Sequence, residues 1–122
     1  LTPNGAFNVP EYGTVKDHDQ FRALYAYSPY HHVQDGAAYP AVLFMTGAND
    51  PRVDPFHSRK MVARLQEASS SGRPILLRTS ADTGHGMGTP LAAEIEENAD
   101  IYSFLTSQLG IDVNAALGPE KK

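Results

Sequence analysis

The 122-residue sequence contains no cysteine and no tryptophan. Without cysteine, the chain has neither a disulfide nor a cysteine-ligated zinc site, and cysteine usage leaves the redox compartment undetermined. The sequence has no apolar run long enough to span a bilayer and no signal-peptide pattern at its start. Its net charge of −4 gives no reason to expect nucleic acid or an anionic membrane as a partner. We therefore expect a soluble protein, cytoplasmic or exported.

The sequence also has no pattern typical of a metal site. His31 and His32 are neighbours, so their side chains point apart in an extended backbone and cannot share one metal. His18 and His57 have no partner at ligand spacing, and no H-x-x-x-H pattern occurs. We predict no metal and no cofactor.

A third absence concerns the nucleophile. The G-x-S-x-G elbow that carries the serine of α/β-hydrolases does not occur in the sequence. Ser28, Ser58 and Ser80 lack the flanking glycines that so sharp a turn requires. Ser28 also precedes a proline, and Ser58 lies within a predicted helix.

Two short apolar runs predict buried strands. Residues 41–45 are an unbroken apolar run that ends in the polar turn 46–50, which is typical of a strand covered on both faces in a parallel sheet. Residues 74–79 form the second apolar run, and the glycine-rich loop 81–88 follows it.

Three helices are predicted around these strands. One spans residues 19–26, with Asp17 or Asp19 as its cap, and Ser28-Pro29 ends it. Another begins at Asp54-Pro55 and runs to the serine run at 69–71. Its apolar stripe consists of Met61, Val62, Leu65 and Ala68.

The last helix is predicted from Thr89-Pro90 to Gly110. One of its faces is apolar and consists of Leu91, Ile95, Ala99, Tyr102 and Leu105. The acidic residues Glu94, Glu96, Glu97 and Asp100 lie elsewhere and are most simply a solvated surface. Residues 1–17 are predicted to form an irregular loop, and residues 114–122 a polar tail.

This alternation of helices and strands predicts an α/β fold with parallel strands and crossover helices. Two strands do not make a self-sufficient sheet, so we interpret the chain as the C-terminal portion of a larger sheet. The exposed sheet edge and helix faces would then favour self-association of the fragment.

Asp50 and His85 are the candidate catalytic residues, because each follows a predicted strand. Loops after neighbouring parallel strands lie at the same edge, so the two side chains can meet. A carboxylate beside an imidazole selects its tautomer and stabilises the imidazolium, and glycines on both sides of His85 let its loop bend. From spacing alone, the alternative of a turn-capping Asp50 and an exposed loop His85 stays equally open.

Several segments resemble the catalytic domain of prolyl oligopeptidases. They are residues 46–53 (TGANDPRV), 55–58 (PFHS), 84–86 (GHG), 27–33 (YSPYHHV) and 11–13 (EYG). The resemblance covers about residues 5–112, and its segments come in the order of that family.

This resemblance implies that residues 1–113 are the C-terminal part of an α/β-hydrolase peptidase domain, with residues 114–122 as a tail. It implies a serine peptidase that cleaves short peptides, typically after proline, and whose catalytic domain is combined with a β-propeller. Asp50 matches the triad aspartate and His85 the triad histidine. Since the acid precedes the histidine, the serine is expected upstream of Leu1 and this chain alone is expected to be inactive.

The resemblance also implies substrate-binding residues. Arg52 matches an arginine that binds a substrate carbonyl or carboxylate; a solvated surface charge is the alternative. Tyr12 and Val53 match positions that line a proline pocket, and Phe7 stands near the place of a tryptophan that stacks on proline. For Phe7 and Val53, a simple packing role is equally open. Because the sequence has no tryptophan, it does not determine how strict the proline preference is.

Two other functions are compatible with these residues. One is another α/β-hydrolase with the same triad order, such as an aminopeptidase or an esterase. The other is a non-catalytic α/β module that acts as a dimerisation unit. The upstream sequence discriminates among them, since a propeller favours the oligopeptidase and a bare hydrolase domain the esterase.

Overall fold

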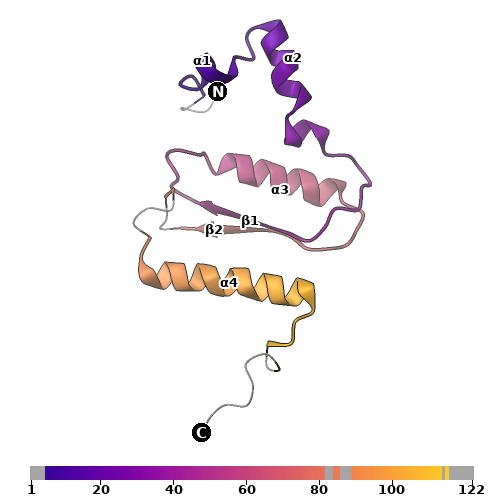
Figure 1. Ribbon diagram of the computed structural model, residues 1–122, viewed down its shortest axis with the longest axis vertical. Helices are drawn as coiled ribbons and strands as arrows, with labels where there is room; N and C mark the ends of the chain where they lie inside the picture. The colour runs from indigo at the N-terminus through magenta and orange to yellow at the C-terminus, as the bar shows by residue number, and fades with distance from the viewer. Residues whose placement is uncertain (1–4, 82–83, 86–88, 114, 116–122) are drawn as a thin grey trace.

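A two-stranded parallel sheet lies between two helices (Figure 1). The computed structural model describes residues 5–81, 84–85, 89–113 and 115. Strand β1 (Val42–Gly47) pairs with β2 (Ile75–Ser80) in a parallel register that runs from Val42 opposite Ile75 to Gly47 opposite Ser80. Helix α3 (Phe56–Ala68) connects the two strands, which confirms the predicted α/β order.

Both strands extend slightly beyond the predicted apolar runs. Thr46 and Gly47 belong to β1 and pair with Thr79 and Ser80, because main-chain hydrogen bonding continues after the apolar side chains end. The expectation of full burial was wrong, since every residue of β1 is only partly buried. A sheet of two strands has open edges on both sides, which leaves part of each strand accessible.

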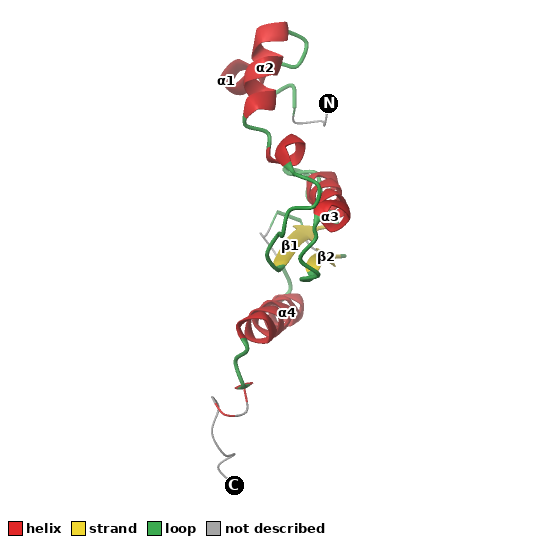
Figure 2. Ribbon diagram, turned by 90° about the vertical axis from the view of Figure 1, so that its right-hand side faces the viewer, coloured by secondary structure: helices red, strands yellow, loops and turns green. Residues whose placement is uncertain are grey.

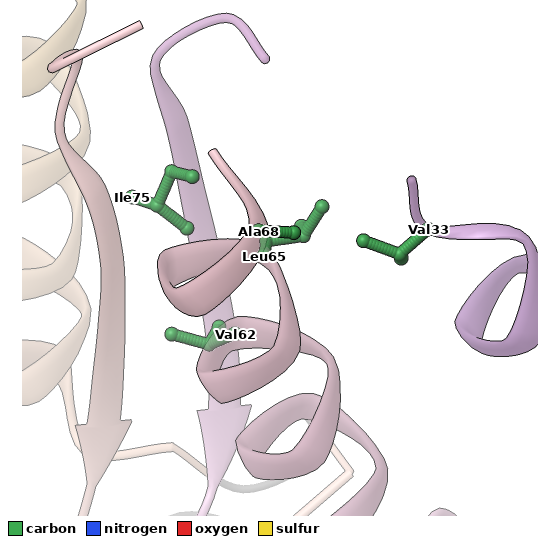
Figure 3. Packing of buried hydrophobic residues seen from close by; sticks show 5 residues of the cluster. All are labelled: Val33, Val62, Leu65, Ala68 and Ile75. Carbon is green, nitrogen blue, oxygen red and sulfur yellow. The ribbon is translucent and has the colours of Figure 1, made fainter. Parts of the chain in front are cut away.

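The apolar core lies on the α3 side of the sheet. It contains Val33, Val62, Leu65, Ala68 and Ile75 (Figure 3). Three of these residues come from the predicted apolar stripe of α3, and Met61 packs against them. The helical period therefore identified the covered face of α3 correctly.

The N-terminal segment lies beyond α3, away from the sheet, and contains three short helices (Figures 1 and 2). Helix α2 (His18–Ala26) confirms the prediction, with Asp17 as the cap that accepts hydrogen bonds from the backbone of Asp19 and Gln20. The 3₁₀ helix η1 (Pro29–His32) follows it. The expectation of an irregular loop over residues 1–17 was wrong at α1 (Val9–Tyr12), a single helical turn with proline in its first positions.

Helix α4 (Leu91–Leu109) lies on the opposite side of the sheet from α3 (Figures 1 and 2). The acidic residues were expected to form a solvated surface. Asp100 is 61% and Glu97 36% exposed, but both also pair with Arg78 of β2, which the sequence did not predict. The side chain of Arg78 is only 16% exposed, and its positive charge draws the acidic side of the helix toward the sheet. The apolar side, including Leu91, Ile95 and Tyr102, is exposed instead.

In the described part of the chain, no helix is both long and apolar enough to cross a membrane. The predicted tail, residues 114–122, falls outside the described residues except for Ala115.

Candidate active site

Asp50 is held by its own loop. After β1 ends at Gly47, the chain turns back, and one carboxylate oxygen of Asp50, Oδ1, accepts hydrogen bonds from the backbone N–H groups of Arg52 at 2.9 Å and Val53 at 2.8 Å. The Asp50 side chain is only 10% exposed. These bonds determine the orientation of the carboxylate, as in other Asx turns.

The second carboxylate oxygen of Asp50 contacts His85. The distance between Asp50 Oδ2 and His85 Nδ1 is 2.8 Å, although the residues are 35 positions apart. The predicted meeting of the two loops at one edge of the sheet is therefore confirmed. An ionised carboxylate only accepts, so Nδ1 carries the proton and Nε2 is the ring nitrogen with a free lone pair.

The pKa of Asp50 lies below its ordinary value. The backbone N–H of Val53 lowers this pKa most, while partial burial acts in the opposite direction. The hydrogen bond from His85 and the N–H of Arg52 lower it further. Asp50 is therefore an anion at neutral pH and can stabilise a positive charge on the imidazole of His85.

A hollow of about 640 Å³ opens beside this pair. The residues around it come from the end of β1, both loops and the first turns of α3 and α4: Met45, Thr46, Gly47, Asp50, Val53, Ser58, Gly84, His85, Thr89, Glu94 and Glu97. The His85 side chain is 42% exposed and is accessible to a reactant.

Val53 is the predicted substrate-binding residue that lines this hollow. The sequence reasoning missed Glu97 as a second lining residue. A signal was available, because Arg78 is the one basic residue in the two strands and an arginine in a partly covered strand requires an acidic partner.

The other predicted substrate-binding residues lie elsewhere. The side chain of Arg52 is exposed, and its backbone holds Asp50. Phe7 and Tyr12 belong to the N-terminal segment, on the far side of α3 from the sheet, so the structure does not bring them to Asp50 and His85 (Figures 1 and 2). Helix α1 has no buried residue, so no packing draws it toward the strand ends.

The three serines considered above have other surroundings. Ser28 Oγ lies 2.8 Å from Nδ1 of His31, and Ser80 Oγ contacts Arg78 and Glu97. Ser58 lies in the first turns of α3 and lines the hollow. Within the described residues, none of these hydroxyl groups is hydrogen-bonded to His85.

The expectation that glycines beside His85 let its loop bend can be tested at Gly84. Gly86 falls outside the described residues. Gly84 does not have a positive φ, and a Cβ placed there would make ordinary contacts with the backbone oxygen of Asn49 and the ring of Pro51. The conformation of Gly84 in this chain therefore does not require a glycine. Across the described residues, no three His, Cys, Asp or Glu side chains converge as metal ligands do.

Comparison with known proteins gives a consistent result. The model of the prolyl oligopeptidase family matches residues 3–112. A prolyl endopeptidase of Elizabethkingia meningoseptica is 40% identical over 108 residues, which are 88% of this chain and 15% of that protein. The chain thus spans about 15% of the length of this curated relative.

Solved structures agree with this match. A structure from a mechanistic study of two prolyl endopeptidases is 44% identical, with a TM-score of 0.81 over 88% of this chain and 16% of that one. Prolyl oligopeptidase B from Galerina marginata, bound to a 35-residue hydrolysis and macrocyclisation substrate, is 32% identical, with a TM-score of 0.79 over 90% of this chain and 16% of that one. That structure is of a variant in which a serine is replaced by alanine, and related structures replace a histidine or an aspartate.

Proposed function

We propose, for a chain that belongs to the prolyl oligopeptidase family, that Asp50 and His85 are the acid and the base of a serine peptidase triad. The observation that carries this proposal is the 2.8 Å contact between Asp50 Oδ2 and His85 Nδ1 at the carboxyl ends of two parallel strands. The complete protein then cleaves short peptides after proline, in keeping with the names of its relatives.

In this mechanism, Nε2 of His85 removes the proton from a serine hydroxyl while the serine oxygen bonds to the scissile carbonyl carbon. The protonated imidazole then gives that proton to the leaving amine as the C–N bond breaks. His85 next removes a proton from a water molecule as the water oxygen bonds to the acyl carbon, and it returns that proton to the serine oxygen as the ester C–O bond breaks. Asp50 holds the imidazole in the tautomer with the proton on Nδ1 and offsets its charge in both steps.

The remaining parts of the site would come from the rest of the protein. Because the serine comes before the acid in the family order of Ser, Asp and His, we infer a serine upstream of Asp50; the 122-residue sequence has no G-x-S-x-G elbow. We assign residues 1–113 to the C-terminal part of an α/β-hydrolase peptidase domain and residues 114–122 to a tail. The partners of this part are the N-terminal part of the catalytic domain and a β-propeller, which the 15% share of the relative's length accommodates.

The substrate contacts follow from the same family match. Val53 forms part of the wall for the proline ring, since it lines the hollow beside His85. Arg52 binds a substrate carbonyl with its guanidinium fork. Phe7 and Tyr12 contribute to the proline pocket only where the remainder of the catalytic domain brings the N-terminal segment to the strand ends.

His85→Ala tests this proposal in the complete protein. The variant removes the general base, so kcat for a chromogenic proline peptide should fall by about 10⁴-fold or more while the fold is retained. His18→Ala is a matched control, because His18 Nδ1 also lies close to an aspartate, Asp19, at 3.2 Å, but far from the hollow. Near-normal turnover by His85→Ala would contradict the proposal. Turnover of simple esters but of no peptide would favour the esterase instead.

A further inference from the structure

We propose that Asn49 is a positioning residue that fastens the loop of Asp50 to the loop of His85. This inference rests on the catalytic roles proposed above for those two residues. Asn49 itself contacts no reacting atom, and it acts through the distance and orientation between the acid and the imidazole.

The geometry begins where the sheet ends. Directly after β1, the N–H of Ala48 donates a hydrogen bond to the carbonyl oxygen of Ser80, at 2.9 Å. One residue further along each chain, the side-chain amide of Asn49 donates to the carbonyl oxygen of Ala81 at 2.7 Å. The Asn49 side chain thus adds one more hydrogen bond between the two segments, just beyond the paired strands.

The His85 loop returns to Asn49 a second time. A Cβ placed on Gly84 would lie 3.6 Å from the carbonyl oxygen of Asn49 and 3.8 Å from Cδ of Pro51. Residue 84 directly precedes His85, so the main chain of Asn49 lies near this loop next to the imidazole, while the Asn49 side chain is bonded to the start of the loop at Ala81. Asn49 also directly precedes Asp50, and its position affects both members of the pair.

An amide suits this position chemically. The carbonyl oxygen of Ala81 can only accept a hydrogen bond, so residue 49 must donate one. Asp50, the residue after Asn49, must instead remain an acceptor for His85 and for its own loop. A carboxylate at position 49 would repel the Ala81 oxygen and place a second negative charge next to Asp50. A neutral donor fastens the two loops without changing the charge of the pair.

The experiment uses Asn49→Ala and Asn49→Asp in the complete protein. Misalignment of the acid and the imidazole should lower kcat for a chromogenic proline peptide by about 10–100-fold and leave KM within about threefold. The rate of inactivation by diisopropyl fluorophosphate, which reports serine activation without a peptide, should fall in parallel. Asn98→Ala is the matched control, because the Asn98 amide also donates to a backbone carbonyl, that of Glu94 at 2.9 Å, but joins no loops; this control should keep normal kcat.

A double-mutant cycle with Asp50→Asn separates positioning from general stability. If Asn49 acts through the pair, Asn49→Ala should cause no further loss of kcat in the Asp50→Asn background, because the alignment it maintains no longer matters. A full multiplicative loss in that background would overturn the inference. So would kcat within about twofold of wild type for folded Asn49→Ala.

Asn49→Asp has nearly the shape of the native side chain and supplies the test if Asn49→Ala does not fold. Failure of both variants to fold, with Asn98→Ala folded, would assign Asn49 to stability alone and overturn the inference. His85→Ala keeps the two proposals apart. Normal activity of His85→Ala would remove the catalytic assignment, whereas loss in His85→Ala together with normal Asn49 variants would remove only this inference.

Discussion

At the scale of single residues, the two oxygens of Asp50 have separate tasks. Oδ1 is bonded to the backbone of residues 52 and 53, and Oδ2 to the ring of His85. Because the loop already holds one oxygen, the other cannot rotate away without losing two backbone bonds. The same backbone bonds lower the pKa of Asp50 and keep it ionised beside the imidazole.

The lowered pKa of Asp50 predicts how stability depends on pH. The folded-state pKa lies below the ordinary value of 3.8, so the hydrogen bonds of the carboxylate contribute fully above that value. Their contribution is lost as the pH falls through the folded-state pKa. We expect Asp50→Asn to lower the urea midpoint of unfolding at neutral pH. The difference in urea midpoint between wild type and variant should narrow below pH 3.8. A gap that stays constant down to about pH 2 would contradict this assignment.

At the scale of elements, Arg78 joins α4 to the sheet. Its Nε donates to Asp100 Oδ2 at 2.7 Å, and its Nη1 lies 3.4 Å from Glu97 Oε2. Glu97 in turn accepts a hydrogen bond from Ser80 at the end of β2. Since the loop of His85 begins after Ser80 and ends at α4, this network fixes both ends of that loop.

We expect Arg78→Met to destabilise the docking of α4. The change removes a largely covered cation and leaves two half-exposed carboxylates without their partner, which should lower the free energy of unfolding by about 1–3 kcal/mol. Urea unfolding monitored by circular dichroism measures this loss. Arg73→Met, at an exposed position outside the strand, is the control and should change stability by less than about 0.5 kcal/mol. If Arg78→Met and Arg73→Met lowered the free energy of unfolding equally, the Arg78 network would make no specific contribution to stability.

At the scale of the whole molecule, the apolar surface is far from fully covered. Five hydrophobic residues of the described chain are buried, and all five lie in or around α3. On α4, Leu91, Ile95 and Tyr102 are each at least 60% exposed, and no third strand pairs with the sheet within the described residues. Surfaces of this kind are normally covered in a complete domain, which agrees with a chain that spans about 15% of its relative's length.

We therefore expect the isolated chain to self-associate and to lack peptidase activity. Light scattering after size exclusion should give a mass above 13.2 kDa that rises with concentration. Ile95→Lys, which places a charge in the exposed apolar face of α4, should reduce that mass, whereas Glu96→Lys on the same helix should reduce it less. A chromogenic proline peptide should not be cleaved above the buffer rate. Clear turnover by pure chain would mean that a nucleophile lies within these 122 residues.

The sequence was sufficient for both strands and for the three longer helices, and it identified the two residues of the central pair as candidates. Apolar runs and helical periods depend on neighbouring residues, so they predicted β1, β2, α2, α3 and α4 to within one or two positions. The order of those elements allowed Asp50 and His85 to meet, because parallel strands bring their carboxyl ends to one edge, and the structure decided between this contact and an exposed loop histidine.

Only the tertiary structure decided the contacts between side chains distant in sequence. It turned the acidic side of α4 toward Arg78, placed the N-terminal segment with α1 beyond α3, and joined Asn49 to Ala81. The physical reason is that local patterns state which residues share a face but not which partner that face will meet. The partner depends on the charges and open surfaces that the assembled sheet presents, and these exist only after the chain has folded.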